Sequence, residues 1–280
     1  MCYSLLVDKN NLKKALPLIV LILFLIPIIT SSLLDLRQKQ REEKAYLKML
    51  AEQKAQKEGE ERIYLLGKFE PSERGDFLPI PAEYNMSGYT TYLRKETLEA
   101  FIRMAEAAKK ENVDLEIVSA VRNFDSQKKI WDDKWTGVTL VDGKRLNEST
   151  PDGLERFKKI LEYSSVPGTS RHHWGTDIDI NMTVPFYFQT EAGQKVYEWL
   201  VKNASTYGFC QPYSAKGQER PTGYNEEKWH WSYLPLAKDF TQRYKTLVTD
   251  KDITDFAGDE NTASMNLIND YVLGISPECL

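Results

Sequence analysis

One uncharged stretch near the N-terminus constrains this chain more than any other feature. From Ala15 to Leu34 no residue carries a charge, and most are Leu, Ile, Val or Phe. A helix of this length extends about 30 Å, which is the thickness of the hydrocarbon core of a bilayer. The sequence therefore predicts a transmembrane helix over residues 15–34, preceded by a short N-terminal segment, residues 1–14.

A cleaved signal peptide is the alternative for this stretch, because Lys9, Lys13 and Lys14 form a positive flank. The apolar run is longer than the roughly 7 to 15 residues of a signal-peptide core. Residues 30–32 (Thr-Ser-Ser) also form a weak cleavage site, so we favour an uncleaved anchor. Basic residues follow the stretch as well as precede it, so the positive-inside rule does not assign its orientation.

The composition changes twice beyond the anchor. Residues 35–62 are rich in Lys, Arg, Glu, Gln and Ala, which is typical of an exposed helix or a solvated stalk. Apolar and aromatic residues reach globular density from Ile63 onward, so we expect one folded domain over residues 63–280. The net charge of -4 argues against a nucleic-acid partner, because phosphate binding needs clustered Lys and Arg.

The spacing of apolar residues predicts several helices in this domain. One helix is expected over roughly residues 95–110, a second begins at Thr150, and a third is capped by Thr190 and ends at Gly208. The acidic tail from Thr249 keeps apolar residues at helical spacing. We therefore expect part of this C-terminal extension to pack on the domain.

Three strands are expected between and after these helices. They cover residues 115–121, 176–181 and 229–234, where β-branched and aromatic residues alternate with polar ones. In the second strand, alternation places the two aspartates on one face and the two isoleucines in the core.

The chain has only three histidines, His172, His173 and His230, so any imidazole chemistry is confined to two short segments. A catalytic zinc ion needs about three protein ligands and one open position for water. His172, Asp179 and His230 supply that set if the strand of Asp179 lies beside the strand of His230. Glu227, three residues before the last of them, is then placed to act as a general base toward water.

Nearby residues have more than one interpretation. His173 is expected to have no metal role, because one ligand from this pair suffices. Asp177 is a metal ligand, a partner that orients a histidine, or a solvated carboxylate, and we favour the second. Arg122, at a strand end, suits a clamp for an anion or a carbonyl. Cys210 is interpreted as a buried apolar residue rather than a metal ligand, and its pairing with Cys279 is left open.

Three motifs in this order resemble the zinc D-alanyl-D-alanine carboxypeptidases of the VanY-like type, whose superfamily includes L,D- and D,D-peptidases and the hedgehog signalling domain. The pattern is Ser-x-x-Arg and a Gln, then Ser-x-His-x-x-Gly-x-Ala-x-Asp, then Glu-x-x-His with Trp before the His. The matching residues are Ser119, Arg122, Gln127, Ser170, His172, Gly175, Asp179, Glu227, Trp229 and His230. The resemblance covers roughly residues 90–240. The chain departs from the pattern at Asp177, where the pattern has Ala, and a charge there bears on zinc affinity and substrate preference.

The resemblance implies an α+β fold in which an antiparallel sheet carries a zinc site and helices flank the sheet. The zinc ligands that it implies are His172, Asp179 and His230. It implies Glu227 as the catalytic base and Arg122 as the group that stabilises the oxyanion. Gln127 and Ser170 are implied to line the substrate.

The function that follows is that of a bacterial zinc metallopeptidase, a D,D-carboxypeptidase that removes the terminal D-Ala from peptidoglycan stem peptides. Because this substrate lies outside the cytoplasmic membrane, we expect a single-pass protein with its catalytic domain on the periplasmic or extracellular side. The alternatives are a cell-wall endopeptidase, an L,D-carboxypeptidase, and a non-catalytic zinc-stabilised module that binds peptidoglycan. Glu227 and Arg122 argue against the last, since a structural site needs neither a base nor an oxyanion clamp. No oligomeric state follows from the sequence.

Overall fold

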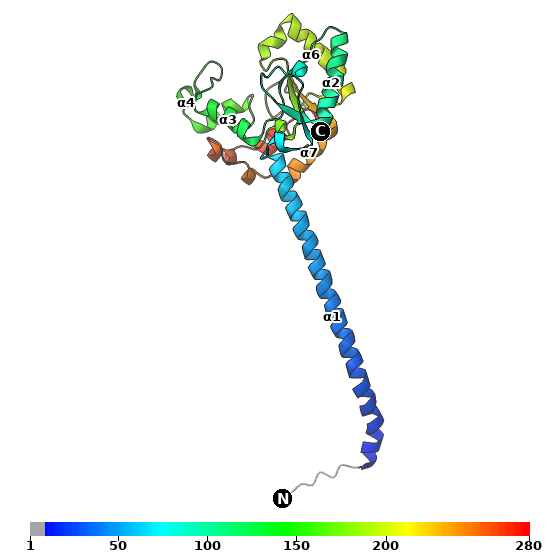
Figure 1. Cartoon of the computed structure of the whole chain (residues 1–280). Helices are drawn as coiled ribbons and strands as arrows, with labels where there is room; N and C mark the ends of the chain where they lie inside the picture. Colours follow the sequence, from blue (N-terminus) through cyan, green and yellow to red (C-terminus); the bar gives the residue numbers. More distant parts are fainter. Residues whose placement is uncertain (1–8) are drawn as a thin grey trace. The chain divides into compact units, whose positions relative to one another are not determined.

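A computed structural model describes residues 9–280, with side chains for residues 16–18 and 20–280 (Figure 1). The chain divides into two compact units, one ending at Glu58 and the other comprising Gly59–Leu280. Residues 1–8 of the expected N-terminal segment lie outside the described residues. All of the predicted catalytic residues belong to the second unit, which is called the domain below.

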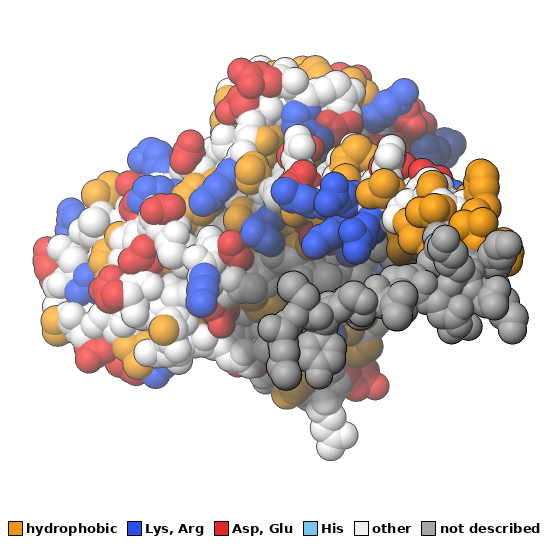
Figure 2. All heavy atoms as spheres, turned by 90° about the horizontal axis from the view of Figure 1, so that it is seen from below, with side chains coloured by type: hydrophobic (Ala, Val, Ile, Leu, Met, Phe, Trp, Pro, Cys, Tyr) orange, Lys and Arg blue, Asp and Glu red, His pale blue; other side chains and the backbone are white. Residues whose placement is uncertain are grey.

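The first helix, α1 (Lys9–Leu65), includes the predicted anchor and continues through the predicted charged segment. It is long and apolar enough to cross a membrane, and its most apolar window has a mean hydropathy of 2.6. Exposed hydrophobic side chains run along it from Leu16 to Leu36, and Figure 2 shows a large group of exposed hydrophobic side chains at its right edge. The hydroxyl of Thr30 donates to the backbone carbonyl of Pro27 at 2.9 Å, so this polar group is satisfied within the helix, as a bilayer requires.

Four short strands form an antiparallel sheet in the domain. Their order is β3 (Ile117–Ser119), β4 (Asp177–Ile180), β6 (His230–Tyr233) and β5 (Phe209–Cys210). A separate antiparallel pair is formed by β1 (Phe77–Pro79) and β2 (Tyr92–Arg94). The register of β4 and β6 places Asp179 opposite His230 and Asp177 opposite Ser232. The predicted α+β class with an antiparallel sheet is confirmed.

Helices and short turns surround the sheet. The helices are α2 (Lys95–Lys110), α3 (Phe124–Trp135), α4 (Leu146–Ser149), α5 (Gly153–Leu161), α6 (Glu191–Asn203) and α7 (Leu234–Leu247). The 3-10 turns are Pro71–Glu73, Ala82–Tyr84, Arg171–Trp174, Pro185–Gln189, Ala204–Tyr207, Asp250–Asp252, Asp259–Ser264 and Pro277–Cys279, and Ile268–Val272 is a π-helical turn.

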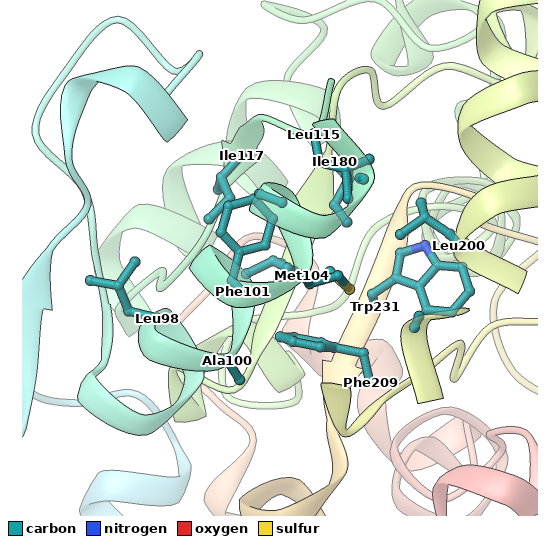
Figure 3. Close-up of a cluster of buried hydrophobic side chains, with 14 of the residues drawn as sticks. Leu98, Ala100, Phe101, Met104, Leu115, Ile117, Ile180, Leu200, Phe209 and Trp231 are labelled. Carbon is teal, nitrogen blue, oxygen red and sulfur yellow. The ribbon is translucent and has the colours of Figure 1, made fainter. Parts of the chain in front are cut away.

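Apolar residues of α2 and α6 cover one face of the four-stranded sheet. Figure 3 shows side chains of Phe101 and Met104 from α2 converging with Ile180 and Trp231 from the strands, and all four are buried. The alternation of β4 sends its two isoleucines into this cluster and its two aspartates to the opposite face. That opposite face is also buried, because every residue of β4 is buried. It is there that the charged residues gather.

A second cluster packs α3 and α5 against the C-terminal tail. The Trp131 ring lies 4.9 Å from that of Phe157 and 5.7 Å from that of Phe256, measured between centroids. The tail therefore packs on the domain. The tail forms short turns and not one continuous helix. Asp255 and Gly258 adopt φ of 73° and 84°, left-handed conformations that no α-helix contains.

Two predicted helix boundaries also need correction. Asp152, not Thr150, caps α5, because its carboxylate accepts a hydrogen bond from the Glu155 backbone N–H at 2.9 Å. Thr190 does cap α6, as predicted. That helix ends at Asn203, however, and Gly208 instead closes the 3-10 turn that follows, with φ of 85°.

The first predicted strand is shorter in the structure, and the open question of Cys210 pairing has an answer there. β3 covers only Ile117–Ser119 of residues 115–121, and its register against β4 shifts within the strand. Cys210 is buried but forms a disulfide with Cys279, 69 residues later. This bond ties the last residues of the chain to β5.

Candidate active site

Three predicted metal ligands converge from one turn and two paired strands. His172 lies on the 3-10 turn Arg171–Trp174, Asp179 on β4 and His230 on β6. The turn ends at Gly175, whose φ is 69° and where a Cβ would lie 2.4 Å from the Phe77 ring, so only glycine fits. The chain enters β4 directly from this turn. The antiparallel register then places Asp179 beside His230.

The spacing of these side chains suits a tetrahedral metal. The three residues are only 2–3% exposed. Asp179 Oδ1 lies 3.4 Å from His172 Nε2 and 3.2 Å from His230 Nδ1, and one ligand atom of each residue lies within 4.8 Å of the others. Ligand atoms at their usual distance from a tetrahedral zinc ion are about 3.3 Å apart. Both separations from Asp179 match that value.

The second ring nitrogen of each histidine holds its ring in place. His172 Nδ1 donates to the Ala120 carbonyl at 2.8 Å, and His230 Nε2 donates to Asp177 Oδ1 at 3.0 Å. These bonds leave the lone pairs of His172 Nε2 and His230 Nδ1 facing Asp179. Within the described chain, His172 Nε2 and Asp179 Oδ1 are buried without a hydrogen-bond partner. Such atoms are rare in proteins, and a bound cation would satisfy both, so this donor set fits zinc.

The charges around the triad also favour a cation. Burial lowers the pKa of His172, so its ring is neutral, as a metal ligand must be. Burial would raise the pKa of Asp179, but the two histidines hold it well below its ordinary value. Burial would lower the pKa of His230, yet the adjacent carboxylates of Asp177, Asp179 and Glu227 raise it well above its usual range. Three carboxylates thus compete for one imidazole, and a divalent cation would replace the proton that they hold there.

Asp177, the departure from the family pattern, belongs to a fully buried ion pair. Its Oδ1 accepts from Arg171 Nε at 3.0 Å as well as from His230. Arg171 is 0% exposed and also donates to Ser232 Oγ at 2.8 Å and to Thr241 Oγ1 at 2.9 Å. Burial would raise the pKa of Asp177, but the charge of Arg171 and the bond from His230 keep it well below its ordinary value. Asp177 therefore contacts the far nitrogen of His230, on the side away from Asp179.

Glu227 and Arg122 flank the triad. Glu227 is buried, and its Oε2 lies 3.3 Å from His230 Nδ1. Burial raises the pKa of Glu227, although His230 opposes the shift, and a raised pKa makes a carboxylate a stronger base. Arg122 Nη1 donates to Ser119 Oγ at 3.0 Å and lies 3.8 Å from Asp179 Oδ2. In the described chain Arg122 Nε has no hydrogen-bond partner, so it is free to donate to a ligand oxygen.

His173 points away from the triad and supports the backbone of Arg122. Its Nδ1 donates to the Arg122 carbonyl at 2.6 Å, and its Nε2 accepts from the Gly168 backbone N–H at 3.0 Å. Burial lowers the pKa of His173 to about 3, so the ring is neutral and can make both bonds. It is not a member of the metal-binding group found among the described residues.

A cavity of about 260 Å³ opens over the triad. Gln127 lines it, and the buried Oε1 of its side chain has no partner in the described chain. Ser170 is buried and is not among the lining residues. Sequence reasoning missed Lys134, Tyr163 and Tyr213, which do line the cavity. The sequence could have indicated Lys134, because it lies seven residues after Gln127 and therefore on the same helix face. It gave no such indication for the two tyrosines, which lie in irregular segments.

Several known proteins are similar to this chain. The family model for VanY, D-alanyl-D-alanine carboxypeptidase, matches residues 90–236. A Bacillus subtilis protein named "Putative carboxypeptidase YodJ" is 33% identical over 175 residues, which cover 61% of this chain and 56% of that protein. A D-alanyl-D-alanine carboxypeptidase of Enterococcus faecalis is 27% identical over 170 residues, or 56% of each chain. The chain therefore spans little more than half the length of these relatives.

Among solved structures, that of the LdcB LD-carboxypeptidase is similar to this chain. The two are 28% identical with a TM-score of 0.46, and the match covers 65% of this chain and 77% of the other.

Proposed function

Because the chain belongs to the VanY family of D-alanyl-D-alanine carboxypeptidases, we propose that it is a zinc-dependent D,D-carboxypeptidase that hydrolyses the terminal D-Ala of peptidoglycan stem peptides. One observation carries the proposal. The unpartnered atoms of His172 and Asp179 face each other beside His230, and the Glu227 carboxylate lies 3.3 Å from that same His230 ring. A metal-binding set with a buried base beside it is what metal-assisted hydrolysis needs.

Each residue has a defined task in this mechanism. Zinc held by His172, Asp179 and His230 would supply Lewis-acid chemistry, lowering the pKa of a coordinated water and polarising the scissile carbonyl. Glu227 accepts the proton of the attacking water and passes it to the amine of the leaving D-Ala, which regenerates the base. Arg122 Nε donates to the carbonyl oxygen as negative charge develops there.

The two expected substrate contacts differ in their positions. Gln127 lines the cavity, and its buried Oε1 lacks a hydrogen-bond partner in the described chain, so this oxygen suits a peptide N–H. Ser170 instead precedes the turn that carries His172, and its backbone carbonyl accepts from the His173 N–H at 3.1 Å. We therefore assign substrate contact to Gln127, and we assign to Ser170 the support of the turn.

Two features support a membrane-anchored enzyme whose catalytic domain lies outside the cytoplasm. The apolar part of α1 is long enough to hold the protein in the cytoplasmic membrane. The disulfide between Cys210 and Cys279 is typical of an oxidising compartment, and it therefore supports an extracytoplasmic domain. Peptidoglycan lies on that side, so the N-terminus is assigned to the inside.

Release of D-Ala tests the proposal. The full-length protein, purified in detergent and supplied with Zn²⁺, should release D-Ala from a pentapeptide stem. Glu227→Gln should keep its zinc and lose activity by about 10²- to 10⁴-fold. Glu226→Gln is the matched control, because this neighbouring carboxylate does not line the cavity, and it should keep both zinc and activity.

Mass spectrometry of the products separates the alternatives. A D,D-carboxypeptidase shortens a pentapeptide by one D-Ala, an L,D-carboxypeptidase shortens a tetrapeptide, and an endopeptidase cuts cross-links. Full activity of Glu227→Gln would refute the assignment of the base. Peptide binding without turnover by the zinc-loaded protein would favour the non-catalytic module instead.

A further inference from the structure

The cavity contains a cation that the proposed mechanism does not use. Lys134 lies near the end of α3 and lines the cavity together with Gln127 and Ile130. These positions are three and four residues apart, so the helix presents all three side chains on one face. Lys134 thus faces the ligand space rather than the solvent side of the helix.

Other lysines of the same helix behave differently. Lys128 and Lys129 each form an ion pair with the aspartate four residues later, at 2.5 Å and 2.7 Å. Within residues 9–280, Lys134 has no carboxylate within ion-pair distance, and its ammonium group donates to the Ser164 hydroxyl. Ser164 is itself buried and lines the cavity. The charged ammonium of Lys134 is thus paired, within the described chain, with a neutral hydroxyl and not with a carboxylate.

The surroundings of Lys134 explain why an anion would bind there. Burial lowers its pKa, the positive charge of Arg122 lowers it further, and the negative charge of Glu227 opposes both. Lys134 therefore lies within the electrostatic reach of two catalytic groups. A half-buried ammonium without a counter-ion is unfavourable, so an anionic ligand group that reached it would gain a charge-assisted hydrogen bond.

We propose that Lys134, together with Ser164, binds the C-terminal carboxylate of the stem peptide. This inference rests on the proposed function, and it names the group that recognises the end of the substrate. The charged lining residues are Arg122, Lys134, Asp179 and Glu227, which sum to zero, so a divalent ion leaves the cavity with a charge of +2. A peptide that brings one terminal carboxylate reduces that excess.

The size of the cavity identifies which carboxylate binds. Its volume of about 260 Å³ is below the roughly 300–1,000 Å³ of pockets for drug-sized ligands. The metal-binding set and Lys134 line this same small space, so an anion bound there lies close to the bond that is cut. In a carboxypeptidase substrate the terminal carboxylate belongs to the leaving residue, whereas other stem carboxylates lie farther from that bond. A chain that continued past the leaving residue, as in an endopeptidase substrate, would place a neutral amide against Lys134.

Binding of matched peptides tests the inference. The ligands are a pentapeptide stem that ends in D-Ala-D-Ala with a free carboxylate and the same peptide with a C-terminal carboxamide. Their Kd values are measured by calorimetry on zinc-loaded, full-length Glu227→Gln, which should bind without turnover. Adding Lys134→Met should raise the Kd of the acid by about 10- to 100-fold, the range for a hydrogen bond to a charged group, and leave that of the amide unchanged. Lys129→Met, on the solvent side of α3, should change neither, and Lys134→Arg should keep most of the preference for the acid.

Three outcomes would count against the inference. The inference is overturned if Glu227→Gln, which keeps Lys134, binds the acid and the amide with equal affinity. It is also overturned if Lys134→Met weakens the binding of both peptides equally. D-Ala release by the unsubstituted protein is measured in parallel. If the protein releases D-Ala but binds acid and amide equally, only the role of Lys134 is refuted. If it neither releases D-Ala nor binds the peptide, the proposed function is refuted as well. If Lys134→Met does not fold, loss of the acid preference in Lys134→Arg overturns the inference.

Discussion

The buried guanidinium of Arg171 offers a quantitative test of how the sheet carries its charges. Arg171 is 0% exposed and donates to Asp177, Ser232 and Thr241. In Arg171→Met, Asp177 loses its guanidinium partner, and breaking a buried ion pair from one side costs about 3–5 kcal/mol. For a domain of this size, 1 kcal/mol shifts Tm by about 2–4 °C. Arg171→Met should therefore lower the Tm of the metal-free protein by roughly 6–20 °C.

A double-mutant cycle separates lost pairing from lost packing. Arg171→Met combined with Asp177→Ala removes both charges, and apolar replacement of a whole buried pair is often close to neutral. The double variant should be more stable than Arg171→Met alone, with a coupling free energy of about 1–3 kcal/mol. Lys158→Met, which breaks an exposed pair with Glu155, is the control and should shift Tm by less than about 4 °C. Thermal denaturation in the presence of a chelator gives all the values. If the two single losses simply add in the double variant, the reasoning is refuted.

Three further changes have defined outcomes. Asp179→Asn should weaken zinc binding by more than about 100-fold, which exceeds the effect of losing a residue that only hydrogen-bonds to a ligand. Competition with a chromogenic chelator measures the affinity, and an unchanged affinity would exclude Asp179 as a ligand. Burial would raise the pKa of Asp76, but a hydrogen bond from Arg74 and nearby positive charge lower it below 3.8. The stability that Asp76 contributes is then complete above about pH 4 and lost as pH falls through the folded-state pKa. Asp76→Asn should lower Tm at neutral pH but not in strong acid, and a pH-independent difference would contradict this. Cys279→Ser opens the loop that begins at Cys210, a loss of roughly 4 kcal/mol by loop-closure entropy, so Tm should fall by about 8–16 °C. An unchanged Tm would mean that packing alone holds the tail.

Much of the site follows from local pattern. The alternation of β4 places Asp177 on the face of Asp179, and the structure shows it hydrogen-bonded to His230. The triad itself needed one condition that local pattern does not supply, the pairing of β4 with β6. The structure meets it, with Asp179 opposite His230.

Other features depend on contacts between distant segments and were not predicted. Spacing alone does not show that Cys210 meets Cys279, because that encounter requires the tail to fold back over the domain. The burial of Arg171 was equally hidden, since its partner Thr241 lies on α7. Lys134 was overlooked because an isolated lysine on a helix is usually solvated, although its spacing places it on the same helix face as Gln127.

The departure from the family pattern at Asp177 is best understood together with Arg171. Both lie in one turn-strand unit, six residues apart, and their side chains are in direct contact. The carboxylate brings a second negative charge close to His230, which makes that imidazole a stronger metal ligand. The Arg171 guanidinium compensates the negative charge of Asp177, which is buried out of contact with water. Restoring the pattern's alanine at 177 alone would leave Arg171 buried without its counter-ion, so Asp177→Ala should be less stable than the double variant. The two positions therefore act as one unit, and neither substitution alone yields an uncharged, satisfied interior beside His230.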